Sequence, residues 1–127
     1  MQTQSKHKFP KLKDNNNGKD CSYYMNIEEK QIQRDEQTEE TMFVADEYLI
    51  KKPLETITSN DIVKEVITQM FSLEMEQKLI NEFNGAMIGI YSDEEKQQKV
   101  LRYKRFLEER ERIKEQINTD CKEINLA

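Results

Sequence analysis

Apolar residues are regularly spaced in the second half of the chain and sparse in the first third. Between residues 60 and 84 they recur every three or four positions, the spacing of an amphipathic helix. The segment 58–61, Thr-Ser-Asn-Asp, offers N-cap residues before this run, and Asn84-Gly85 offers a stop signal after it. Ser72 could cap a second helix. The pattern therefore predicts one helix over 60–84, or two that meet at Ser72, and places the centre of the core there.

A second helix is predicted from Ser92, which stands three residues before Glu95 as in a capping box, to about residue 120. In its first half, an apolar face formed by Val100, Tyr103, Phe106 and Leu107 is expected to pack on residues 60–84. From residue 108 onward, we expect the helix to project beyond this core. Its apolar stripe there continues through Ile113, Ile117, Cys121 and Ile124. This stripe predicts a surface for docking or self-association, although it is too short and interrupted for an autonomous coiled coil.

Residues 42–50, Met-Phe-Val-Ala-Asp-Glu-Tyr-Leu-Ile, form an apolar island that ends before Pro53. Its spacing fits a strand and a helix almost equally well. Such an element could cover the core of this chain, or it could be a short motif that docks on another protein. We take residues 42–57 as an extended docking segment. Its predicted contact residues are Phe43, Tyr48 and Ile50.

The first 41 residues contain few side chains that could be buried. Residues 1–26 hold one proline, one glycine and three consecutive asparagines, and this composition predicts disorder because little apolar burial opposes the loss of backbone entropy. Residues 27–41 predict a nascent helix or an acidic linker. The expected fold is mainly α: a helical hairpin or three-helix cluster over 58–127, with a long C-terminal helix and a disordered arm over 1–41.

The composition favours long helices with solvent-exposed faces over a compact β-protein. Of the 127 residues, 35% are hydrophobic and 35% are charged, and tryptophan is absent. The net charge of -5 is uneven, because residues 1–26 carry five lysines and two acids, whereas residues 27–47 carry eight acids and two bases. Cys21 and Cys121 have no zinc-site or disulfide-framework spacing. Without a signal-peptide or membrane-spanning pattern, the expected location is the cytoplasm, or a particle assembled there.

The sequence offers no set of residues typical of catalysis. His7 is the single histidine, and no phosphate-binding or metal-binding motif is present. We therefore predict no catalytic residues, no cofactor, no metal and no small-molecule substrate. The alternative, a nucleic-acid contact, would use the basic start of the C-terminal helix, with Lys99, Arg102, Lys104 and Arg105.

These observations favour a non-enzymatic protein that binds proteins. We expect a small structural or adaptor subunit of a larger assembly, such as a bacteriophage particle. Its partner, or a second copy of the chain, would bind through the C-terminal helix and residues 42–50. The predicted contact residues are Phe43, Tyr48, Ile50, Ile113, Ile117 and Ile124. The alternative is a small helical regulator that binds nucleic acid. The partner, the oligomeric state and the biological process stay open.

Overall fold

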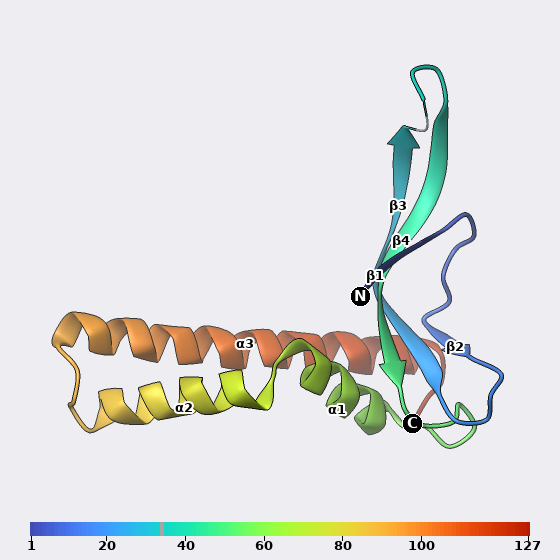
Figure 1. The fold of residues 1–127 in the computed structure, drawn as a ribbon. Coiled ribbons are helices and arrows are strands. Elements are labelled where there is room, and N and C mark those ends of the chain that lie inside the picture. Colours follow the sequence, from blue (N-terminus) through green and yellow to red (C-terminus); the bar gives the residue numbers. More distant parts are fainter. Residues whose placement is uncertain (34) are drawn as a thin grey trace.

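The computed structural model describes residues 1–33 and 35–127, and within them four antiparallel strands precede three helices (Figure 1). The strands are β1 (Gln2–Ser5), β2 (Leu12–Asp14), β3 (Cys21–Gln33) and β4 (Glu39–Ile50), in the order β1-β4-β3-β2. The helices are α1 (Ser59–Met70), α2 (Leu73–Met87) and α3 (Asp93–Glu123). Helices α1 and α2 follow one another along α3, and the sheet stands across the C-terminal end of α3 (Figure 1).

The predictions of a mainly α fold and of a disordered N-terminal arm are wrong. Residues 21–25, Cys-Ser-Tyr-Tyr-Met, are all buried, and β3 pairs with β4 in a register that sets Cys21 opposite Ile50. The residues before them are mostly polar, and they are ordered by strand pairing more than by apolar burial. Strand β1 pairs with β4 and strand β2 pairs with β3, so the backbone groups of β1 and β2 form hydrogen bonds. Phe9 adds an aromatic contact, stacking on Tyr24 with 4.9 Å between ring centroids.

Residues 27–41, predicted as a nascent helix or acidic linker, belong instead to the outer half of the β3–β4 hairpin. A β-bulge between Met25 and Glu28 separates this half from the rest of the sheet. Asn26 lies in the bulge with a φ of 56°, and its side-chain amide donates to Asp46 Oδ2 at 2.9 Å. We refer to residues 26–41 as the ribbon.

One core joins the sheet to α1 and to the second half of α3. Its buried members come from β3, β4, the loop before α1, α1 and α3: Cys21, Tyr23, Met25, Ile50, Ile57, Ile62, Val66, Ile113, Ile117 and Cys121. The second half of α3 therefore packs on the sheet, where a projecting helix was expected. The first half of α3 packs on α2, as Phe83 and Tyr103 show by stacking at 4.8 Å. Phe106 packs edge-on against Phe71 at 5.1 Å, so the predicted contact of Tyr103 and Phe106 with residues 60–84 is confirmed.

The helix starts follow the sequence signals closely. Thr58 caps α1 in a reciprocal capping box with Asp61, Ser72 caps α2, and Ser92 caps α3. Residues 60–84 are therefore divided between two helices.

The predicted stop at Asn84-Gly85 is wrong, since α2 continues to Met87. Gly85 serves close packing instead: a Cβ there would lie 2.9 Å from the side chains of Ile90 and Tyr91. The left-handed residue that ends α2 is Gly89, with a φ of 83°.

Candidate interaction surfaces

The ribbon becomes two-stranded from Lys30, opposite Met42, outward, because the β4 residues that face Glu28 and Glu29 at its base also pair with β1. Strand β1 pairs with β4 over Phe43–Asp46, and β2 pairs with β3 over Cys21–Tyr23. Beyond these short strands, β3 and β4 continue side by side as far as Gln33 opposite Glu39. In the described part of the chain, no third strand accompanies them there. The ribbon consequently stands away from the helices, as Figure 1 shows.

Local hydrogen bonds order the end of the ribbon. Asp35 Oδ1 accepts from the backbone amides of Gln37 and Thr38, at 2.9 Å and 2.8 Å. These bonds, the one from Gln37 foremost, lower the pKa of the Asp35 carboxyl below its ordinary value. Lower on the ribbon, Gln31 Nε2 donates to Thr41 Oγ1 at 2.9 Å across the two strands. The turn is thus held by its own residues and presents a charged carboxylate at neutral pH.

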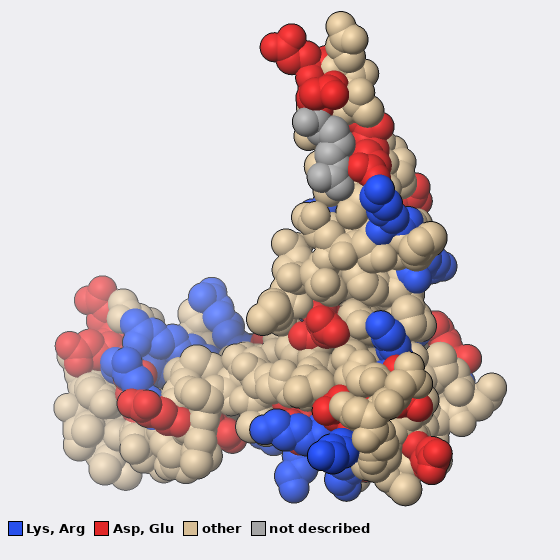
Figure 2. Space-filling model, turned by 45° about the vertical axis from the view of Figure 1, so that its right-hand side comes forward, with Lys and Arg blue, Asp and Glu red and all other residues tan. Residues whose placement is uncertain are grey.

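Acidic residues dominate the ribbon. Residues 26–41 contain six acids and two bases, a net charge of -4. Figure 2 shows acidic side chains gathered toward the far end of this projection, with basic side chains nearer the body. Lys6 Nζ lies 3.4 Å from Glu40 Oε1. Charged side chains on strand edges disfavour pairing with an identical edge. The ribbon is therefore better suited to a positively charged protein surface than to another ribbon.

A second exposed surface lies on the helical arm, which consists of α2 and residues 93–107 of α3. Five large apolar side chains on it are solvent-exposed, of which Met75 is the least, by 38%. The other four are Leu73, by 72%, Met87, by 50%, Leu101, by 45%, and Leu107, by 42%. We call these four residues the arm face. Leu73 and Leu107 line a groove of about 870 Å³ that extends to α1, and Met87 and Leu101 line one of about 670 Å³ near the end of the arm.

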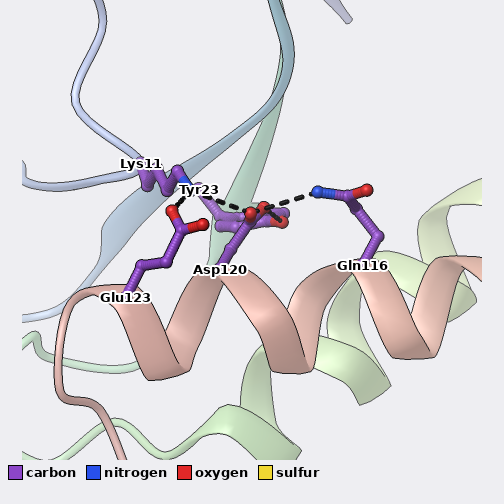
Figure 3. Close-up of polar contacts among 5 residues, drawn as sticks. All are labelled: Lys11, Tyr23, Gln116, Asp120 and Glu123. Atoms are coloured by element: carbon purple, nitrogen blue, oxygen red, sulfur yellow. Dashed lines mark hydrogen bonds and ion pairs between the residues drawn. The ribbon is translucent and has the colours of Figure 1, made fainter.

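A polar cluster joins β3 to the C-terminal end of α3 (Figure 3). Asp120, 5% exposed, accepts a 2.5 Å hydrogen bond from the Tyr23 hydroxyl and bonds from Lys11 Nζ and Gln116 Nε2, each at 3.1 Å. Lys11 also forms an ion pair with Glu123. Burial, followed by the bond to Asp120, raises the pKa of Tyr23, so its hydroxyl keeps the proton that it donates. All three donors bind the Asp120 carboxylate, so the cluster links the N-terminal segment and β3 to α3.

The predicted contact residues in β4 occupy three different environments. Ile50 is fully buried in the core. Tyr48 is half-buried and packs against that core, and burial raises the pKa of its hydroxyl. Phe43 is half-buried between Ser5 and Glu29 of the neighbouring strands. Residues 42–50 thus form an inner strand of this chain's own sheet.

The predicted contact residues in α3 are also mostly covered by this chain. Ile113 and Ile117 are 1% and 0% exposed and pack in the shared core. Ile124, at the C-cap of α3, is 40% exposed. The structure does not bring these three together with Phe43 on one accessible surface. Periodicity identified an apolar stripe correctly, but the element that covers the stripe is a sheet whose strands the sequence did not reveal.

The basic residues considered for nucleic-acid contact are largely paired within the chain. Glu82 lies 3.4 Å from Lys99 Nζ and 3.7 Å from Arg102, and Glu108 lies 3.8 Å from Lys104. Arg105 is exposed on α3. Three of the four cations thus have a carboxylate beside them, which lowers their attraction for phosphate.

Sequence reasoning missed both surfaces. The sequence of the ribbon gives little indication of strands, because Ile27 and Ile32 are its only large apolar residues. Both faces of its strands are therefore mostly polar, and the alternation of apolar and polar residues that predicts a strand is missing. In the arm face, Leu107 was expected on the same apolar side of the helix as Phe106, and this prediction is wrong, since Leu107 is 42% exposed and Phe106 is 7% exposed. The core lies on the side of α3 that carries Phe106 and Ile113, and Leu107 is one residue beyond that side.

Searches for familiar chemistry and for relatives give negative results. In residues 1–33 and 35–127, no group of three His, Cys, Asp or Glu side chains could hold a metal ion. No helix within the same ranges combines the length and the apolar character needed to cross a bilayer. No protein-family model, curated protein or solved structure matches the chain.

Proposed function

We propose that the chain is a non-enzymatic, protein-binding subunit of a larger assembly, and that the ribbon is the arm with which it binds a partner protein. The observation that carries this proposal is the extension of two strands beyond the sheet, with no third strand beside them in the described residues. An isolated two-stranded hairpin is marginally stable in water. Such a projection gains its packing from another molecule, while the sheet at its base holds it in place.

Backbone edges and charge define the kind of partner. The outer edges of the ribbon offer amide and carbonyl groups to an added strand, the mode of recognition called β-augmentation. Six acids within residues 26–41 favour a partner that brings positive charge to the interface. A bacteriophage particle or a comparable assembly offers such partners in many copies, and we place the subunit in the cytoplasm where such particles are built. Two buried free thiols, Cys21 and Cys121, support a reducing setting.

Regulation through nucleic acid gains no comparable support, since Lys99, Arg102 and Lys104 have carboxylates of the same chain beside them.

A shortened ribbon tests the proposal. In this variant Asn-Gly replaces residues 31–41, so that Lys30 and Met42, already opposite each other, flank a two-residue turn. The tagged full chain and this variant are expressed in the cells from which the chain comes, and the co-purified proteins are quantified by mass spectrometry. We expect the shortened variant to fold and to lose the partner.

A matched control keeps the ribbon's length and changes Glu28, Glu36 and Glu39 to glutamine. Because this control retains the strand edges and removes three charges, we expect weaker binding with a smaller dependence on salt. Recovery of the same proteins with the full and the shortened ribbon would contradict the proposal.

A further inference from the structure

The two edges of the ribbon are not equivalent, and the directions of the backbone groups show how they differ. Glu47 and Met1 exchange backbone hydrogen bonds in both directions, at 2.7 Å and 3.0 Å, so the backbone of Glu47 faces β1. Tyr24, which is paired with Glu47, faces the other way, since its amide donates to the Lys11 carbonyl at 2.9 Å. Because successive residues of a strand turn their amide and carbonyl groups to opposite sides, the same alternation continues outward into the ribbon.

The edge of β3 has the longer row of outward-facing backbone groups. Beyond the bulge, three residues of β3 turn their amides and carbonyls away from β4: Glu29, Gln31 and Gln33. In the described part of the chain, pairing on this side of β3 ends at Tyr24, where Lys11 follows on from nothing but the short strand β2. The three residues therefore offer their backbone groups to another molecule.

The edge of β4 is shorter and lies beside a charged side chain of this chain. Among the described residues of the ribbon, Thr41 and Glu39 are those of β4 that turn their backbone groups outward beyond β1. Lys6 directly follows β1, and its ammonium lies 3.4 Å from the Glu40 carboxylate. A lysine beside a strand edge disfavours the addition of a further strand. The β3 edge is therefore the better site for a strand from another protein.

The charges on one face of the ribbon indicate the chemistry of that strand. Glu29 and Gln31 share a face with Glu39 of the neighbouring strand. Glu29 is exposed and has no ion pair with any other described residue, whereas Glu28, on the opposite face, lies 3.7 Å from Lys30. A strand added beside β3 would place one side chain next to Glu29, with about 5 Å between Cβ atoms. A lysine or arginine at that position would supply the missing positive charge.

We propose that the β3 edge from Glu29 to Gln33 binds an extended segment of another protein as an added strand, and that a lysine or arginine of this segment pairs with Glu29. The inference rests on the proposed function of the ribbon and adds the edge, the position and the charge of the bound segment. On the opposite face, the segment places a side chain beside the half-buried Ile32, where an apolar residue fits. A second ribbon is a poorer occupant, because it would bring further acids to the same face.

Proline substitutions distinguish the two edges. Gln31 and Thr41 lie opposite each other and both turn their amides outward, so Gln31→Pro and Thr41→Pro each remove one edge donor and spare the bonds between β3 and β4. Both variants also lose the same side-chain hydrogen bond, from Gln31 Nε2 to Thr41 Oγ1, which makes them a matched pair.

The probe is a fluorescein-labelled peptide of alternating lysine and valine, and a peptide of alternating glutamate and valine is its control. Binding to the full chain is measured by fluorescence anisotropy at low salt. We expect Gln31→Pro to weaken binding of the lysine peptide by about tenfold or more, and Thr41→Pro to leave it unchanged. Glu29→Gln should weaken binding by about fivefold and reduce its salt dependence, whereas Glu39→Gln, on the far strand, should change both less.

The co-purification experiment separates this inference from the proposed function. Gln31→Pro should lose the partner that the full chain recovers, and Thr41→Pro should keep it. If the shortened ribbon loses the partner but the two proline variants behave alike, the assigned edge is wrong and the ribbon is still the binding arm. Retention of the partner by the shortened ribbon would overturn both proposals. A lysine peptide that binds no more tightly than the glutamate peptide, or an oligomer of the purified chain that Gln31→Pro dissociates, would also overturn the inference.

Discussion

Asp120 is the residue on which the attachment of the N-terminal segment to α3 depends most. A carboxylate loses solvation when it is buried, and Asp120 replaces the lost water with three donors: the Tyr23 hydroxyl, Lys11 and Gln116. Two of them come from residues that follow β1, and they reach across more than ninety positions of the chain. Cys121 lies next to Asp120 in the core, where burial raises the pKa of its thiol, with a smaller effect from the Asp120 carboxylate. The cluster therefore fixes which part of α3 meets the sheet.

Asp120→Ala should lower the free energy of unfolding by about 3 kcal/mol, because it leaves the buried Tyr23 hydroxyl without its acceptor and Lys11 without its better-buried carboxylate. The measurement is a urea titration followed by circular dichroism. Glu123→Ala is the control: Glu123 pairs with the same lysine, but its side chain is 57% exposed, so its loss should cost less than about 1 kcal/mol. Equal losses in the free energy of unfolding would show that Asp120 stabilises the fold no more than Glu123 does.

At the scale of elements, the helices could be predicted and the strands could not. Helix starts depend on single side chains near the helix, and Thr58, Ser72 and Ser92 act where their residue types indicate. The strands of the ribbon are stabilised by pairing between residues that have little apolar content, so no local pattern reveals them. Residues 42–50 show the intermediate case: their alternation was readable, but only the partner strand β3 decided between strand and helix.

Helix ends were harder to predict because two glycines compete for the same role. Gly89 has a φ of 83° and open space around its Cβ position, so the cost of Gly89→Ala comes from the backbone alone. We expect a loss of about 1 kcal/mol in the free energy of unfolding. Gly89→Asn should cost about half as much, since asparagine tolerates the left-handed region better. Urea titrations of both variants check this; an alanine variant as stable as wild type would mean that the loop after α2 adopts another conformation.

The sequence could not identify the contact residues, because it does not show which element covers an apolar stripe. An apolar stripe shows that a helix is covered, but it does not identify what covers it. Ile113 and Ile117 were assigned to a partner because no strand was expected to face them. The strands that do face them, β3 and β4, lie more than sixty residues earlier in the chain. The arm face became visible only after the core had accounted for the other side of α3.

At the scale of the whole molecule, the sheet and the helices complete a single core. Helix α1 and the second half of α3 bury Ile62, Val66, Ile113 and Ile117 against residues of β3 and β4. In the helical arm, by contrast, α2 and α3 are held by aromatic contacts such as that between Phe83 and Tyr103. The two projections, ribbon and arm, leave this core in different directions (Figure 1). The shared core therefore lies between the two exposed surfaces (Figure 1).

Residues 58–127 consequently should not fold as an independent domain. Without β3 and β4, the apolar side of α1 and of the second half of α3 would face water, and each large aliphatic side chain left uncovered forgoes about 1.5–3 kcal/mol. We expect a fragment of these residues to keep partial helix content, to aggregate, and to show no cooperative urea transition by circular dichroism. The full chain should unfold in one transition, with circular dichroism and tyrosine fluorescence coinciding.

The ribbon-shortened chain is the control for removal of β-structure. The midpoint of its urea transition should stay close to that of the full chain, because residues 31–41 contribute nothing to the shared core. A fragment that unfolds cooperatively near the midpoint of the full chain would show that the helices need no sheet.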